Sequence, residues 1–89
     1  MTRDPKHQRR LDRRWLRRAE DRAYNQQVDL IIAEHGPEEA DRANYGWFSG
    51  EMPEGVLEIT TKCYVEHANR VLHTICNMYD RTITHHWSS

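Results

Sequence analysis

Large hydrophobic side chains and cysteine are both scarce in this sequence of 89 residues. Hydrophobic residues make up 37% of the chain, Phe48 is its one phenylalanine, and there are two cysteines. Two cysteines are too few to staple a small secreted scaffold, so we expect reduced thiols. No apolar run is longer than Leu30–Ala33, which argues against a membrane span. Charge from the third residue onward also argues against a signal peptide, and together these features predict a cytoplasmic protein.

Motifs for catalysis are missing as well. The sequence has no glycine loop of the kind that cradles phosphates and no serine elbow. Cys63 and His67, four residues apart, would meet on a helix as nucleophile and base, but nothing suggests an oxyanion hole or an orienting carboxylate. The same two residues are the candidate metal ligands, and one helix could not bring further ligands to them. We therefore predict a protein that is not an enzyme and has neither cofactor nor metal.

Charge is distributed very unevenly along the chain. Through Arg22 there are nine basic and four acidic residues, a balance of +5, and the remainder carries four basic and ten acidic residues, a balance of −6. A polarised chain of this kind often has an interaction arm at one end.

The basic end has the pattern of a long amphipathic helix over residues 5–34. Asp4 suits the N-cap and Pro5 the first helical position, whereas Gly36 and Pro37 form a strong stop. One face is apolar and the other is a basic stripe. The apolar face holds Leu11, Trp15, Leu16, Ala19, Ala23 and Leu30, and the stripe holds Lys6, Arg10, Arg13, Arg14 and Arg17.

Three further segments follow this helix. Residues 37–44 begin with proline and two glutamates and predict a short helix, and residues 45–52 predict a loop with large aromatic side chains. Apolar residues then recur at helical spacing through residues 53–80, which predicts a second long helix. A strand over Val56–Val65 is the alternative, since Leu57, Ile59, Thr61, Cys63 and Val65 alternate with more polar neighbours.

These elements predict an all-α fold with two long antiparallel helices joined by the short helix and the aromatic loop. The helical domain would span residues 1–81, and residues 82–89 would be a C-terminal tail. Two helices alone cannot enclose a core, so we expect a homodimer that forms a helical bundle.

The run HQRRLDRRWLRRAEDRA (residues 7–23) resembles the arginine-rich RNA-binding arms of lambdoid N-type antiterminators. The resemblance rests on arginine spacing and on the sequence RRAE at 17–20, covers seventeen residues, and implies contact with nucleic acid. Arginine forks onto phosphates and guanine edges. The predicted contacts are Arg9, Arg10, Arg13, Arg14, Arg17 and Arg18. Trp15, Tyr45, Trp47 and Phe48 are candidates for further partner contacts, and the alternative is that the three loop aromatics plug the open end of the helical hairpin and Trp15 fills the core.

Two alternatives remain open for the basic stripe. It could dock on an acidic protein surface, as in an inhibitor or adaptor that occludes a host protein with its basic and aromatic surfaces. Phage-encoded host-takeover and anti-defence factors are often small and charge-polarised in this way, which is an analogy of size and style. The stripe could also be a solvated face on which Asp12, Glu20 and Asp21 pair with neighbouring arginines.

Overall fold

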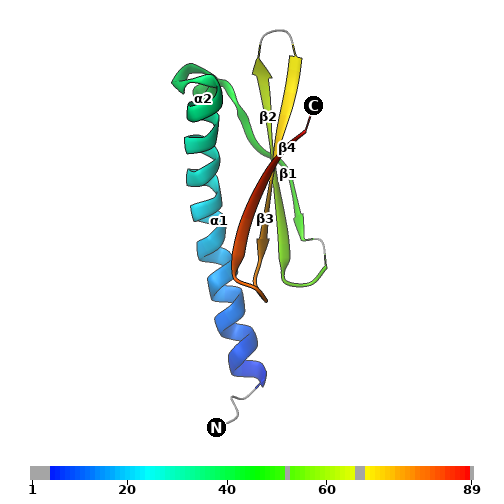
Figure 1. The fold of residues 1–89 in the computed structure, drawn as a ribbon. Helices are drawn as coiled ribbons and strands as arrows, with labels where there is room; N and C mark the ends of the chain where they lie inside the picture. Colours follow the sequence, from blue (N-terminus) through cyan, green and yellow to red (C-terminus); the bar gives the residue numbers. More distant parts are fainter. Residues whose placement is uncertain (1–4, 52, 66–67, 89) are drawn as a thin grey trace.

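The computed structural model describes residues 5–51, 53–65 and 68–88, and the side chains of 12–46, 53–65 and 69–88. These residues form an α+β fold in which a long helix lies against one face of a four-stranded sheet (Figure 1). The elements are, in order, α1 (Pro5–His35), α2 (Pro37–Arg42), β1 (Asn44–Glu51), β2 (Val56–Val65), β3 (Ala68–Asn77) and β4 (Thr82–Ser88). The predicted all-α class is therefore wrong.

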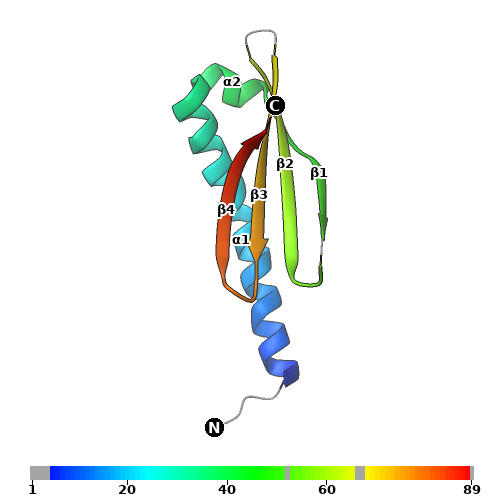
Figure 2. The ribbon, with the colours of Figure 1, turned by 45° about the vertical axis from the view of Figure 1, so that its right-hand side comes forward.

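The sheet is an antiparallel meander with the strand order β1-β2-β3-β4 (Figure 2). Its central hairpin pairs Val56 of β2 with Asn77 of β3 and continues in register along both strands. The pairing of β1 with β2 is interrupted by a register shift between Asn44 and Phe48. Valine, isoleucine and threonine are frequent in β2, and such β-branched residues pack well on a pleated surface.

Helix α1 runs along the sheet and contacts β2, β3 and β4. With 31 residues it is about 46 Å long, whereas a ten-residue strand spans about 33 Å. The first turns of α1 consequently extend past the end of the sheet (Figures 1 and 2). At the other end Gly36 takes a positive φ of 92°, and the chain turns into α2, which contacts α1 and β2.

Two apolar clusters lie between the helix and the sheet. Small alanine side chains of α1 let the helix approach the strands in the first cluster, and longer aliphatic side chains fill the second. The buried members are Ala19, Ala23, Ile59 and Cys76 in the first cluster, and Ile31, Ala40, Cys63 and Leu72 in the second. One chain therefore encloses its own core, which removes the physical reason for expecting a helical homodimer.

A polar layer separates the two clusters. The fully buried Gln27 donates from Nε2 to Thr74 Oγ1 at 2.8 Å and accepts at Oε1 from the Thr61 hydroxyl at 2.6 Å. Thr74 Oγ1 lies 2.7 Å from His85 Nδ1, and His85 Nε2 lies 2.7 Å from Gln26 Oε1. An amide oxygen can only accept, so His85 donates from Nε2 and accepts at Nδ1. These hydrogen bonds compensate the polar groups for their loss of water.

The second predicted long helix, over residues 53–80, is wrong. The described part of this range holds β2, β3, the turn before β2 and the turn after β3, and the alternating pattern considered for Val56–Val65 is the one that the chain adopts. The alternation is explained by the helix on one side. Leu57, Ile59, Thr61, Cys63 and Val65 face α1, and all but Leu57 are buried.

Two shorter segments also differ from the prediction. The aromatic segment 45–52 was predicted as a loop, yet residues 45–51 lie in the edge strand β1. Residues 82–88 were predicted within the tail and instead form β4, which pairs Thr84 with Ile75 of β3. Neither segment has the residue pattern of a strand, and each becomes one by backbone hydrogen bonds to a neighbouring strand.

The thiols of Cys63 and Cys76 are free and buried. They lie on neighbouring strands, β2 and β3. Cys76 pairs across the hairpin with Leu57, six residues from Cys63 along β2. At about 3.3 Å per residue this places the two cysteines about 20 Å apart, beyond the reach of a disulfide.

The face of the sheet opposite α1 is covered by no segment that the structure describes. Its side chains interact with one another: His73 Nδ1 lies 3.1 Å from Glu58 Oε1 and its Nε2 lies 2.8 Å from Ser88 Oγ. The rings of His73 and His86 stack with their centroids 4.7 Å apart. Tyr64 on the same face is 54% exposed.

Candidate nucleic-acid interface

Of the exposed arginines of α1, Arg14 and Arg18 lie on the side of the helix away from the sheet, and Arg17 and Arg22 lie on its two flanks; these four are called the outer arginines. Ala19 and Ala23 are buried against the strands, and Arg14 lies nine residues before Ala23, which is half a turn away at about 100° per residue. Arg18 follows one turn later on the same outer side, and Arg17 lies beside it. The side chains of Arg14, Arg17, Arg18 and Arg22 are all exposed.

These four outer arginines form no ion pair with any side chain that the structure describes. Asp21 lies on the same side of α1, yet no ion pair joins it to Arg17 or Arg18 within the described part. The solvated-face interpretation with i,i+4 pairs therefore has no described contact behind it. The guanidinium groups keep their hydrogen-bonding capacity for a ligand with acceptor oxygens.

Two ion pairs tie the first half of α1 to turns of the sheet. Arg13 Nη2 lies 3.6 Å from Glu54 Oε1 before β2, and both side chains are about two thirds exposed, at 66% and 69%. On the other side of the helix, Arg81 Nη2 in the turn before β4 lies 3.4 Å from Asp12 Oδ1. Exposed pairs contribute little stability, so Arg13 can exchange its partner for another anion with little loss.

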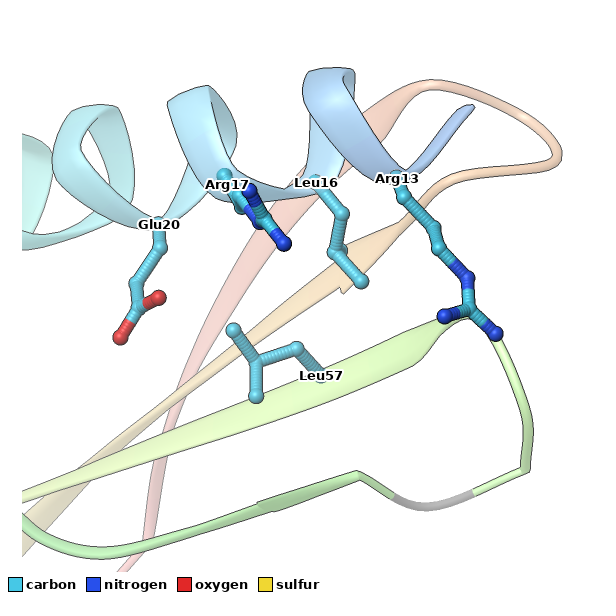
Figure 3. Close-up of a pocket in the computed structure, with 5 residues that line it drawn as sticks. All are labelled: Arg13, Leu16, Arg17, Glu20 and Leu57. Atoms are coloured by element: carbon cyan, nitrogen blue, oxygen red, sulfur yellow. The ribbon is translucent and has the colours of Figure 1, made fainter. Parts of the chain in front are cut away.

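A pocket opens between α1 and the start of β2, beside the outer arginines (Figure 3). Its cavity has a volume of about 260 Å³ and is lined by Arg13, Leu16, Arg17, Glu20 and Leu57. Figure 3 shows Arg13, Leu16 and Glu20 directed from the helix toward the strand, Arg17 beside Leu16, and Leu57 on β2 opposite Leu16. The pocket thus combines apolar walls with two cationic groups and one carboxylate.

The carboxylate of Glu20 has no hydrogen bond or ion pair with a described residue. Its negative charge acts on two neighbours. Burial raises the pKa of Cys76 to about 11, and Glu20 contributes to the increase. Burial also raises the pKa of Tyr24, again with a contribution from Glu20. Glu20 is half-buried at the edge of the core and remains able to accept hydrogen bonds.

The aromatic candidates have different positions. Trp15 is half-buried and packs against the first apolar cluster, so part of its ring is used by the core. Tyr45 packs against the second cluster and donates its hydroxyl to the Ala40 carbonyl at 2.6 Å. Trp47 and Phe48 lie in β1, and their side chains are outside the described residues.

Of the predicted arginine contacts, the structure brings Arg13 and Arg17 to the pocket and places Arg14 and Arg18 on the outer side. Arg9 and Arg10 belong to α1, but their side chains lie outside the described residues.

The metal candidates do not form a described site. Cys63 is buried beside Ile31 and Leu72, and His67 lies outside the described residues. Burial raises the pKa of Cys63, which opposes formation of the thiolate that metal binding or nucleophilic attack requires. In the described ranges no three His, Cys, Asp or Glu side chains gather as metal ligands.

Sequence reasoning missed Leu16, Glu20 and Leu57 as pocket residues. Leu16 was assigned to an apolar helix face and Leu57 to a second helix, so their approach across a helix–sheet interface was not foreseen. The available signal was the alternation of residues 57–65, which places Leu57 on the same face as Ile59 and Thr61.

Neither described helix is long and apolar enough to cross a membrane. Comparisons with protein-family models, with curated proteins and with solved structures found no match to this chain.

Proposed function

We propose that the protein binds nucleic acid, without catalysis, through the outer arginines of α1. The observation that carries this proposal is the set of four exposed guanidinium groups, Arg14, Arg17, Arg18 and Arg22, which have no ion-pair partner in the described part of the chain. Arginines of this kind neutralise phosphates and release their counterions. The excess of positive charge in the first 22 residues adds a field that attracts a polyanion.

The fold supports the proposal by holding these arginines on a rigid element. The other side of α1 is anchored by Ala19, Ala23 and the buried Gln27, so the helix is fixed against the sheet without using its outer side. Arg14 and Arg18 are one turn apart, with Cβ atoms about 6 Å from each other. A ligand with closely spaced phosphates can therefore engage both, and no part of the core has to open.

The test is a salt series of binding to a labelled nucleic acid, followed by fluorescence anisotropy. The logarithm of affinity should fall with the logarithm of salt at a slope of about −0.9 for each phosphate neutralised on duplex DNA. Replacing Arg14 and Arg18 together with glutamine should make the slope shallower by about 1.8. The matched control removes Arg42 and Lys62, which is the same charge at two sites away from α1, and should leave the slope close to that of the unchanged protein.

A second candidate is a protein that binds another protein through the uncovered face of the sheet. The exposed ring of Tyr64, 54% exposed, and the half-buried Val71 and Ile75 on this face favour it. Such binding would depend little on salt and would be weakened by Tyr64→Ser, not by loss of Arg14 and Arg18. A salt-independent partner that needs Tyr64, together with no binding of nucleic acid at low salt, would replace the first proposal with this one.

A further inference from the structure

We infer that the pocket between α1 and β2 takes an unpaired nucleobase, with guanine preferred over uracil. The inference deepens the nucleic-acid binding proposed above and rests on it. It names the class of strand, one with accessible bases, and assigns Leu16, Leu57 and Glu20 to base recognition.

The pocket lies beside arginines that can bind a phosphate. Arg17 belongs to the exposed arginine side of α1 and also lines the pocket, together with Arg13. A phosphate held by these two arginines would therefore place its own nucleotide next to the cavity. The cavity volume of about 260 Å³ is large enough for a flat heterocyclic ring and is too small for a stacked base pair.

Two walls of the pocket are apolar. Leu16 from the helix and Leu57 from the strand both point into the cavity, where they offer apolar surface to the faces of a ring (Figure 3). In a duplex the faces of each base are covered by stacking and its Watson–Crick edge is paired. The bases of a single strand expose both faces and this hydrogen-bonding edge. The pocket consequently favours single strands, loops and bulges over regular duplex.

Glu20 provides the hydrogen-bond acceptor of the pocket. Its carboxylate lines the cavity and has no partner among the described residues, so it can accept hydrogen bonds from a base. Guanine presents two adjacent donors, N1–H and the N2 amino group, to a carboxylate. Uracil presents N3–H between two carbonyl oxygens, which repel it. Glu20 therefore selects guanine, and a glutamine at this position would weaken the selection because its oxygen carries no full charge.

The experiment compares three labelled probes at one salt concentration: a short uridine strand with one central guanosine, the same strand with uridine throughout, and a duplex of equal charge. The guanosine strand should bind about tenfold tighter than the uridine strand, within the range of one stacked and hydrogen-bonded base. Glu20→Gln should remove most of that difference. Leu57→Phe, which fills the cavity, should lower affinity for the guanosine strand about tenfold and leave duplex binding unchanged.

Val56→Phe is the matched control, since it adds the same ring to the next residue of β2 on the opposite face of the sheet. Circular dichroism establishes that each variant is folded, and Glu20→Gln keeps the test decisive if Leu57→Phe unfolds. Equal binding of all three probes, unaffected by Leu57→Phe and Glu20→Gln, overturns the pocket inference while the proposed function stands. Binding of no probe at low salt overturns both. A guanosine preference that disappears in Glu20→Gln and persists in Val56→Phe supports the inference.

Discussion

The two halves of α1 use their polar side chains in opposite ways. In the second half, from Ala23 to His35, these side chains bond across the interface: Gln26 and Gln27 reach the sheet, and Arg70 of β3 lies 3.0 Å from His35 Nε2. In the described part of the first half, the side chains of Asp12 and Arg13 form ion pairs with turns at the end of the sheet, and the outer arginines have no described ion-pair partner. The polar side chains of the second half thus hold the helix to the sheet, and the outer arginines of the first half are available for a ligand.

The far end of the second half shows how completely its groups are used. The Arg70 guanidinium lies 4.3 Å from the centroid of the Trp87 ring, and Nη1 of the same group lies 3.8 Å from Glu34 Oε2. His35 and Trp87 meet edge to face with centroids 5.4 Å apart. One arginine thus joins α1, β3 and β4, in contrast with four outer arginines that join nothing described.

Among the substitutions in the second half of α1, Gln27→Leu should lower the free energy of unfolding most. The substitution keeps an approximately equal volume but leaves the Thr61 and Thr74 hydroxyls and the Ile59 carbonyl without the amide that now bonds them. Buried groups left unpaired should lower the free energy of unfolding by about 2–4 kcal/mol. Urea denaturation measures this loss. Asn25→Ala, an exposed change on the outer side of α1, should stay within about 0.5 kcal/mol, and a Gln27→Leu protein of unchanged stability would contradict the structural role of the polar layer.

The polar layer also shows what the sequence could not reveal. Gln27 has the appearance of a surface residue in the sequence, and its partners Thr61 and Thr74 lie more than thirty residues away. Nothing local marks such a residue as buried, because its burial depends on a sheet that forms around it. Helix α1, in contrast, is set by local signals: Pro5 at its start, the Gly36–Pro37 stop and a continuous helical period. These signals predicted its range to within one residue at its C-terminal end.

The second helix failed for a physical reason that can be read in β3. Val71 and Leu72 form one pair of adjacent apolar residues, and Ile75 and Cys76 form a second pair four residues later, which is also the repeat of a helical face. In the sheet the two neighbours of each pair point to opposite sides: Leu72 and Cys76 are buried under α1, and Val71 and Ile75 are half-buried on the uncovered face. A strand with apolar residues on both faces therefore mimics a helix, and tertiary pairing decides between the two.

The same distinction separates the parts of the candidate site. The arginines at 14, 17 and 18 were predicted as contacts from their spacing on one helix, and the structure leaves their side chains exposed. The pocket depends on the approach of Leu57 to Leu16, which are 41 positions apart and meet only after the sheet has formed. Local periodicity can place the first set, and no local pattern can place the second.

Gly46→Ala should have the next largest effect, because it disturbs the contact between β1 and the second half of α1. Gly46 has a φ of 61°, and a Cβ atom there would meet the hydroxyl end of Tyr24. Backbone strain and displacement of Tyr24 together should lower the free energy of unfolding by about 2–3 kcal/mol. Gly36→Ala is the control: its φ is 92° but nothing lies within 4 Å of the added atom, so about 1 kcal/mol is expected.

A double-mutant cycle isolates the contact from the strain. In a Tyr24→Phe background the clashing hydroxyl is absent, so Gly46→Ala should be less damaging than in the original protein. Equal losses in the two backgrounds would show that Tyr24 and Gly46 do not press on each other.

Acidification should weaken the second half through His85. Burial lowers the pKa of His85 below its usual 6.5, and the neutral ring accepts from Thr74 at Nδ1 while it donates to Gln26. The unfolded chain then binds more protons, so this contribution to stability is complete above pH 6.5 and is lost as the pH falls below it toward the folded pKa. The urea midpoint should therefore fall between pH 7.5 and pH 5.5, a range above the ordinary titration of carboxylates.

His85→Gln tests this assignment, since an amide at the same position does not titrate. The variant should start from a lower midpoint but lose less of it on acidification. Asp29 and Gln26 line the hollow beside His85, and Asp29→Asn shows whether a carboxylate contributes to the same change. His86→Gln replaces an exposed histidine on the uncovered face and should retain the loss. An acid-induced loss that is unaffected by His85→Gln would place the responsible group elsewhere.

Substitution of exposed arginines in the first half of α1 should change stability least. This result would distinguish the first half from the second most clearly. Arg14→Gln with Arg18→Gln removes two exposed guanidinium groups that make no described ion pair, so the free energy of unfolding should change by less than about 0.5 kcal/mol. Arg70→Gln, which removes a guanidinium that joins β3 to α1 and β4, should lower it by more than about 1 kcal/mol. Urea titrations of both variants at the same pH measure the contrast. Substantial unfolding of the Arg14 and Arg18 variant would show that the outer arginines serve the fold, and the proposed nucleic-acid site would lose its residues, because a guanidinium already held inside the protein is not available to a phosphate.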